Sequence, residues 1–164
     1  MVDERTRLRR RYLSLGAGEL AAAAAFALVA AATLGPRLDG RETAALWSAL
    51  TPLLVVLVQA GAYWLIARGY VGRAPMPALV AATYRVVRAA DVVLLLAGLA
   101  GVLAWWPDRA PVGAGVLAVW AFGVVEYVNY FVVRLAYPAR HWFARVTAWR
   151  TPRLVSDLRR ASTG

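Results

Sequence analysis

Four long apolar stretches, separated by segments that contain arginine, constrain the fold of this chain more than any other feature. A membrane-spanning helix needs about 20 apolar residues, because the hydrocarbon core of a bilayer is about 30 Å thick. With 61% hydrophobic residues, the 164-residue chain is also more apolar than an average water-soluble domain. It therefore predicts an all-α integral membrane protein, a four-transmembrane-helix bundle with short loops. The expected spans are approximately residues 16–35, 44–67, 89–106 and 112–137.

The polar residues outside the spans lie mainly in a basic N-terminal segment, residues 1–15, and a basic tail, residues 139–164. Large apolar residues of the tail recur at helical spacing between arginines: Trp142, Val146 and Trp149. This pattern is typical of an amphipathic helix that lies in the membrane interface. Pro152 interrupts it, and we expect one or two further helical turns over residues 154–160. Residues 78–88 allow two interpretations, a helix on the membrane surface or a direct continuation into the third span.

Positive charge alternates from one connecting segment to the next. The N-terminal segment, the loop between spans two and three, and the residues from Arg134 onward carry net charges of +3, +4 and +6. The two other linkers are neutral: Arg37, Asp39, Arg41 and Glu42 in one, Asp108 and Arg109 in the other. Cytoplasmic loops of membrane proteins carry the excess of basic residues. We therefore predict a multi-pass membrane protein with both termini in the cytoplasm.

Composition narrows the classes of function. All 19 basic residues are arginine and alanine is abundant, which is typical of a GC-rich bacterial genome, so we expect the bacterial plasma membrane. The net charge of +10 is spread over the ends of the apolar stretches, and we predict no nucleic-acid partner. The absence of cysteine excludes disulfides and thiol chemistry, and a single histidine, His141, excludes multi-histidine metal sites within one chain. We expect no catalytic residue, cofactor or metal site, since no complete motif for one is present.

Arg9, Arg10 and Arg11 also resemble a twin-arginine export signal. The apolar stretch that follows them is longer than the roughly 7–15 apolar residues of a signal peptide. Cleavage would also leave three spans and place the new N-terminus outside. We therefore interpret these arginines as the anchor of an uncleaved first helix.

Polar residues of the expected fourth span fall on one broad helical face: Glu126, Asn129, Tyr130 and Arg134. An ionisable residue at the centre of a membrane helix costs about 2.5–3.5 kcal/mol on insertion scales, so this face must contact other helices or water. Glu126 precedes Ala136 by ten residues, about 15 Å of helix, which predicts a position near the bilayer midplane.

Further polar residues lie in the other spans: Glu19, Gln59 and Asp91. We expect the acids to join a buried charge network with Arg85, Arg88 and Arg134, in which Arg88 and Asp91 pair within one helix. These groups either fix the register of the helices or form a binding site. The candidate ligand- or proton-binding residues are Glu126, Asn129, Tyr130, Arg134, Glu19, Asp91 and Gln59. The candidate contacts to anionic lipid headgroups are Arg85, Arg88, Arg140, Arg145 and Arg150.

The leading hypothesis from sequence is a non-enzymatic accessory or scaffold protein that works through helix contacts and a basic cytoplasmic face. The alternative is a small proton-coupled transporter that uses Glu126, and a second alternative is a lipid-modifying enzyme with Glu126 or Asp91 as base. The expected partners are anionic lipid headgroups at the cytoplasmic face, together with a membrane-protein partner or a second copy of the chain.

Overall fold

The computed structural model describes residues 2–132 and 152–160, and its regular elements in these ranges are all helices. The prediction of an all-α chain with four helices long and apolar enough to cross a membrane is confirmed. The helical segments follow in the order α1 (Val2–Leu28), η1 (Val29–Leu34, π-helical), η2 (Gly35–Arg37, 3₁₀), α2 (Gly40–Tyr70), α3 (Ala78–Ala104), α4 (Ala110–Phe131) and α6 (Arg153–Arg160).

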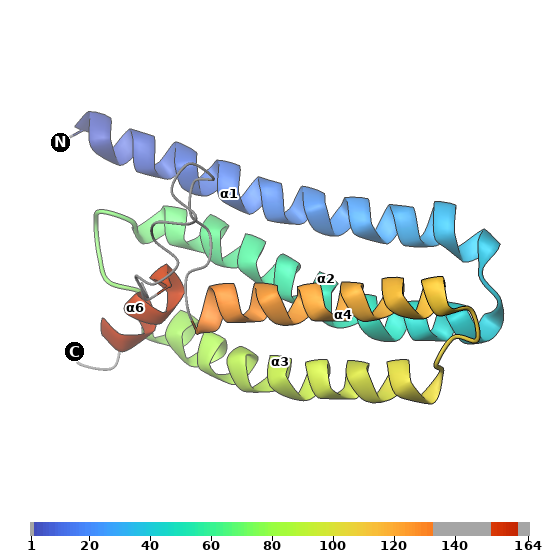
Figure 1. The fold of residues 1–164 in the computed structure, drawn as a ribbon. Helices are drawn as coiled ribbons and strands as arrows, with labels where there is room; N and C mark the ends of the chain where they lie inside the picture. The colour runs from blue at the N-terminus through green and yellow to red at the C-terminus, as the bar shows by residue number, and fades with distance from the viewer. Residues whose placement is uncertain (1, 133–151, 161–164) are drawn as a thin grey trace, which may run out of the picture.

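The four long helices lie side by side, and the short helix α6 lies across one end of the bundle (Figure 1). The start of α1 and the loop between α2 and α3 lie at this end, which we call the basic end because described segments with excess arginine meet there. The turns that join α1 to α2 and α3 to α4 lie at the opposite, neutral end. The alternation of charge along the sequence therefore coincides with the two ends of the bundle.

α2 is the central helix, since it packs against α1, α3 and α4 and is the most buried of the four. Its contact with α1 is so close that it requires glycine on both helices. A Cβ atom at Gly16 would lie 3.0 Å from the carbonyl oxygen of Gly61, and one at Gly61 would lie 2.9 Å from Leu20 Cγ. Small residues let helix backbones approach in a bilayer, where packing takes over from the hydrophobic effect as the driving force.

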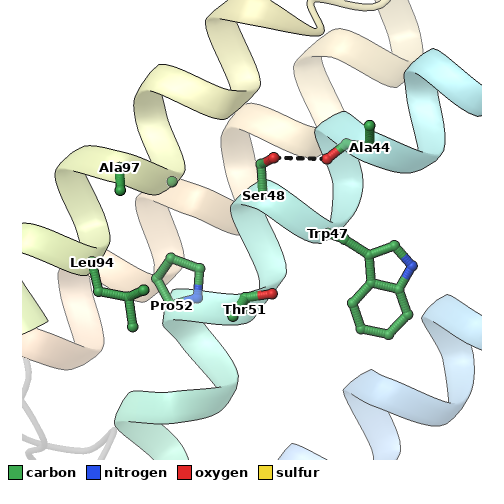
Figure 2. Close-up of a pocket in the computed structure, with 8 residues that line it drawn as sticks. Ala44, Trp47, Ser48, Thr51, Pro52, Leu94 and Ala97 are labelled. Carbon is green, nitrogen blue, oxygen red and sulfur yellow. Dashed lines mark hydrogen bonds between the residues drawn. The ribbon is translucent and has the colours of Figure 1, made fainter.

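The contact between α2 and α3 is built around Pro52. Proline has no backbone N–H, so the carbonyl oxygen of Ser48, one turn earlier, loses its helical donor. A Cβ atom at Gly98 of α3 would lie 2.7 Å from this oxygen and 2.7 Å from Pro52 Cγ. Figure 2 shows this turn of α2, in which Ser48 Oγ donates a hydrogen bond of 2.8 Å to the carbonyl oxygen of Ala44. α3 can approach the interrupted turn because it has no side chain at Gly98.

Ala78 to Ala104 form one continuous helix. Of the two interpretations of residues 78–88, the continuation into the third span is therefore correct and the separate surface helix is wrong. No proline or glycine breaks the chain between Pro77, which precedes the helix, and Gly98. The basic residues 2–15 likewise continue into the apolar part of α1.

The short helix expected over residues 154–160 is confirmed as α6. The expected interfacial helix around Trp142, Val146 and Trp149 lies outside the described residues. The expected end of the fourth span, residues 133–137, lies outside them as well.

The two turns of the neutral end are joined by charged side chains. Asp39 and Glu42 form a capping box at the start of α2: the Glu42 N–H donates to Asp39 Oδ1 over 2.8 Å, and the Asp39 N–H donates to Glu42 Oε2 over 3.3 Å. Arg109, just before α4, donates from Nε to Glu42 Oε1 over 2.5 Å and from Nη2 to Glu42 Oε2. The same Nη2 donates to the carbonyl oxygen of Arg37 over 3.2 Å.

Glu42 is only 1% exposed, and its hydrogen bond to Arg109 raises the pKa of this guanidinium above its ordinary value. Arg41 also faces Asp108, with 3.8 Å between Nη1 and Oδ1, so charges that balance within each linker in the sequence pair between the linkers in the fold.

Replacement of Gly98 by alanine should lower stability by about 1–3 kcal/mol, because the new methyl group overlaps Pro52 and the Ser48 carbonyl group. Gly115→Ala is the matched control, since a Cβ atom at Gly115 would have no other heavy atom within 4 Å. Thermal unfolding of the detergent-solubilised variants by circular dichroism measures the difference. Equal midpoints for the two variants would contradict the close contact between α2 and α3.

Glu42→Gln should lower the unfolding midpoint by several degrees, because it weakens the paired hydrogen bonds that join the two turns. Arg41→Gln should change the midpoint little, because Arg41 and Asp108 form an exposed pair. The same thermal assay compares them, and a larger effect for Arg41→Gln would show that the Glu42–Arg109 pair does not join the turns.

Candidate functional site

A cavity of about 280 Å³ lies between α1, α2 and α4 near the basic end, where α6 covers it. We call it the acidic cavity, because Glu19 of α1 and Glu126 of α4 both line it. The other polar residues of the lining are Arg11, Asn129, Tyr130 and Arg153, and the remaining lining residues are Leu15, Tyr63, Trp64, Pro152 and Leu154. α1 and α4 make little direct contact, so the space between them stays open to these side chains.

Hydrogen bonds connect the two acidic helices across the cavity. The Tyr130 hydroxyl group on α4 donates to the Glu19 carboxylate on α1. Glu126 interacts with Asn129 on its own helix and electrostatically with Glu19. The Trp64 indole nitrogen lies beside the Tyr130 hydroxyl group but donates no hydrogen bond to a described residue. The cavity therefore combines two carboxylates with an aromatic wall.

α6 is held over the cavity by polar and apolar contacts. The Tyr63 hydroxyl group of α2 donates to Asp157 Oδ2 over 2.8 Å, and Arg153 Nε lies 3.4 Å from Asp157 Oδ1. Leu154 and Leu158 are buried in the same cluster as Tyr63. The exposed Arg153 side chain is thereby placed at the rim of the acidic cavity.

The structure brings together four of the candidate residues from the sequence: Glu19, Glu126, Asn129 and Tyr130. Gln59 and Asp91 lie elsewhere, on facing sides of α2 and α3, and Arg134 lies outside the described residues. The expected pair between Arg88 and Asp91 is wrong, because Arg88 is exposed and neither Asp91 oxygen accepts a hydrogen bond. Residues three apart are neighbours on a helix, but here Arg88 lies on the exposed side of this face and Asp91 on its buried side.

The depths in a membrane that the sequence suggests for the two glutamates stay predictions. Its spans place Glu19 near the cytoplasmic edge and Glu126 near the midplane, yet both line one cavity near the basic end. Glu126 lies five residues before Phe131, the last residue of α4 as described. The midplane position depends on Ala136, which lies outside the described residues.

Arg85 and Arg88 are exposed on α3 near the basic end, and Arg85 Nε donates to the carbonyl oxygen of Ala81 over 3.3 Å. Contact of these arginines with anionic headgroups stays a prediction. The remaining candidates for such contact lie outside the described residues: Arg140, Arg145 and Arg150.

Sequence reasoning missed Tyr63 and Asp157. Tyr63 follows Gln59 by four residues, which is a signal for a shared helical face. Asp157 had no such signal, because its contact depends on how a distant part of the chain folds back on α2.

Two further hollows lie nearer the neutral end. An open groove of about 330 Å³ between α2 and α3 is lined mainly by small side chains around Pro52, among them Ala44, Ala97 and Gly98 (Figure 2). An apolar cavity of about 360 Å³ is lined by α2, by α4, and by Leu34 and Leu38 at and after the end of η1. The rings of Phe26 and Phe122, 6.0 Å apart, bridge α1 and α4 between this cavity and the acidic one.

Comparison with known proteins gives no relative from which a function could be proposed. No family model, curated protein or solved structure matches the chain. Within residues 2–132 and 152–160, no group of three or more acidic or histidine side chains is placed to hold a metal ion. The arrangement of the acidic cavity is therefore the main guide to what the protein binds.

Tyr63→Phe should loosen α6, because it removes the hydroxyl group that donates to Asp157. We expect faster hydrogen–deuterium exchange in peptides that contain residues 153–160, measured by mass spectrometry. Tyr84→Phe is the matched control, since the Tyr84 hydroxyl group donates its hydrogen bond to the Gln59 carbonyl oxygen of α2 and not to a residue of α6. Equal exchange of α6 in both variants would contradict its attachment through Tyr63.

Proposed function

We propose that this chain is an integral protein of the bacterial plasma membrane that binds a zwitterionic amphiphile in the acidic cavity and exchanges it for protons. Two carboxylates from different helices, Glu19 and Glu126, line one cavity, and this observation carries the proposal. Both termini lie in the cytoplasm in this proposal, with the basic end on the inner side.

In this proposal, Glu19 and Glu126 are the groups at which the ligand is exchanged for protons. Carboxylates that face one cavity repel each other when both are ionised, and either a proton or a cationic ligand group relieves this repulsion. Entry of an ammonium group between Glu19 and Glu126 would therefore release a proton. This is the role that the transporter hypothesis gave to Glu126, now shared with Glu19.

The rest of the lining supports a zwitterion whose apolar part lies along the helices. Arg11 and Arg153 lie on the same lining as the glutamates and suit a phosphate group, which guanidinium donors bind well. Towards the neutral end, the Phe26–Phe122 contact and the apolar cavity suit an acyl chain. Phosphatidylethanolamine carries both charges and an acyl chain, and it is the probe of choice.

Native mass spectrometry of the purified protein with phosphatidylethanolamine or phosphatidylglycerol tests the binding step. We expect wild-type protein to retain phosphatidylethanolamine preferentially, and Glu19→Gln or Glu126→Gln to weaken this binding at least tenfold, about 1.4 kcal/mol. Glu4→Gln is the control, because Glu4 is an exposed acid of α1 outside the acidic cavity.

Equal retention of the two lipids, unchanged in both cavity variants, would refute the binding site. A pH-sensitive dye in weak buffer then tests the exchange: lipid binding should release protons from wild-type protein and fewer from Glu126→Gln. Binding without proton release would refute the exchange step alone.

The absence of cysteine allows a clean test of topology. Single cysteines at the exposed positions Ala74, in the loop of the basic end, and Ala110, at the neutral end, report the two sides. In intact bacteria we expect a membrane-impermeant maleimide to label Ala110→Cys, and to label Ala74→Cys only after permeabilisation. The reverse pattern would contradict the proposed orientation.

The groove between α2 and α3 favours a second candidate, the accessory or scaffold protein. Its small side chains at Ala44, Ala97 and Gly98 would admit a helix of another membrane protein at close range. A second polypeptide that recurs in the native mass spectra should then be lost in Ala97→Leu, which fills the groove. Ala100→Leu, on an exposed position of α3 outside the groove, should retain it.

A further inference from the structure

Asp91 is a buried acid that the acidic cavity does not include. It lies on α3, is 1% exposed, and faces Gln59 of α2. The Gln59 side chain lies close enough to interact with the carboxyl group, but neither carboxyl oxygen accepts a hydrogen bond of normal geometry, and Gln59 Oε1 is also buried without a donor. Three oxygen acceptors of two neighbouring side chains are thus buried without hydrogen bonds.

The helices around Asp91 supply no compensating charge among the described residues. On its own helix, Arg85 and Arg88 are exposed. From α2 the neutral Gln59 faces the acid, and the Tyr84 hydroxyl group of α3 donates to the Gln59 carbonyl oxygen over 2.8 Å. Two charged side chains of α6 are described, Arg153 and Asp157; they lie beside each other, and Asp157 accepts from Tyr63.

α4 binds α3 on both sides of Asp91 without contacting its carboxyl group. Trp120 Nε1 donates to the carbonyl oxygen of Leu95 over 2.9 Å, and the Tyr127 hydroxyl group donates to that of Arg88 over 3.3 Å. These bonds connect α4 to α3 before and after the acid in the sequence of α3. An ionised carboxylate at this position would therefore be buried with neither a cation nor a full set of donors, which is strongly unfavourable.

We propose that Asp91 is a second proton-binding site, separate from the acidic cavity, that carries its proton at neutral pH. The protonated carboxyl group becomes a donor and Gln59 Oε1 is its acceptor, so that one proton gives hydrogen-bond partners to both side chains. Loss of this proton would leave a charge between α2, α3 and α4. The packing of α3 is then sensitive to pH, whether or not the acidic cavity binds a lipid.

Equilibrium unfolding of the whole protein in mixed detergent micelles, between about pH 5 and pH 9, tests whether Asp91 is protonated in the folded protein. The folded bundle holds a proton at Asp91 that the unfolded chain has released, so the stability of wild-type protein should fall as the pH rises. The slope should be up to about tenfold in the unfolding constant per pH unit. Asp91→Asn, a neutral isostere, should fold and lack this part of the slope.

Asp157→Asn is the matched control, since it removes another buried acid. Asp157 has Tyr63 and Arg153 as partners. This variant should therefore keep the wild-type slope. A wild-type slope in Asp91→Asn, or failure of this variant to fold at every pH, would overturn the proposal. The second outcome would mean that the fold requires the ionised form.

Infrared spectroscopy of the folded protein at neutral pH gives an independent measurement. The C=O stretch of a protonated carboxyl group should be lost in Asp91→Asn and shifted in Gln59→Leu, which removes the acceptor. An unchanged spectrum in Asp91→Asn would overturn the proposal. Stabilisation of wild-type protein by sodium chloride over choline chloride, absent in Asp91→Asn, would also overturn it, because a metal ion would then occupy the site.

Discussion

The arrangement of this bundle depends on the surface of α2. Three helices pack on α2, and at two of these contacts the backbone comes close because a side chain is missing: Gly16 and Gly61 with α1, and Gly98 with α3. In a bilayer, close packing of this kind holds helices together, since burial of apolar side chains gains little when lipid is equally apolar. α1, α3 and α4 are therefore positioned by one shared neighbour more than by each other.

The same helix also organises the polar groups of the basic half. Gln59 faces Asp91, Tyr63 binds Asp157, and Trp64 lies beside Tyr130 in the acidic cavity. These three residues span little more than one turn of α2. Three acids or acid-binding groups of different helices are thus positioned by one short segment of α2.

Apolar length and arginine distribution were sufficient to predict four long helices, because membrane spans depend on local composition. The face shared by Glu126, Asn129 and Tyr130 was also predictable, since it depends only on the helical repeat. The partners of these residues were not, because they depend on how helices rotate against α2. Arg88 and Asp91 were expected to pair, yet they lie on different sides of α3. Glu42 and Arg109 were each balanced by a neighbour in sequence, yet they bind each other across two turns.

The hydrogen bonds between Glu42 and Arg109 restrain the neutral end of the bundle. They join the two hairpins at the neutral end, whereas α1 and α4 make little direct contact along their length and are bridged at the basic end by the Tyr130–Glu19 hydrogen bond. A motion that admits a molecule between α1 and α4 would therefore be restrained at the neutral end and would separate the two helices most at the basic end. The opening would then lie on the same side of the bundle as the excess arginine.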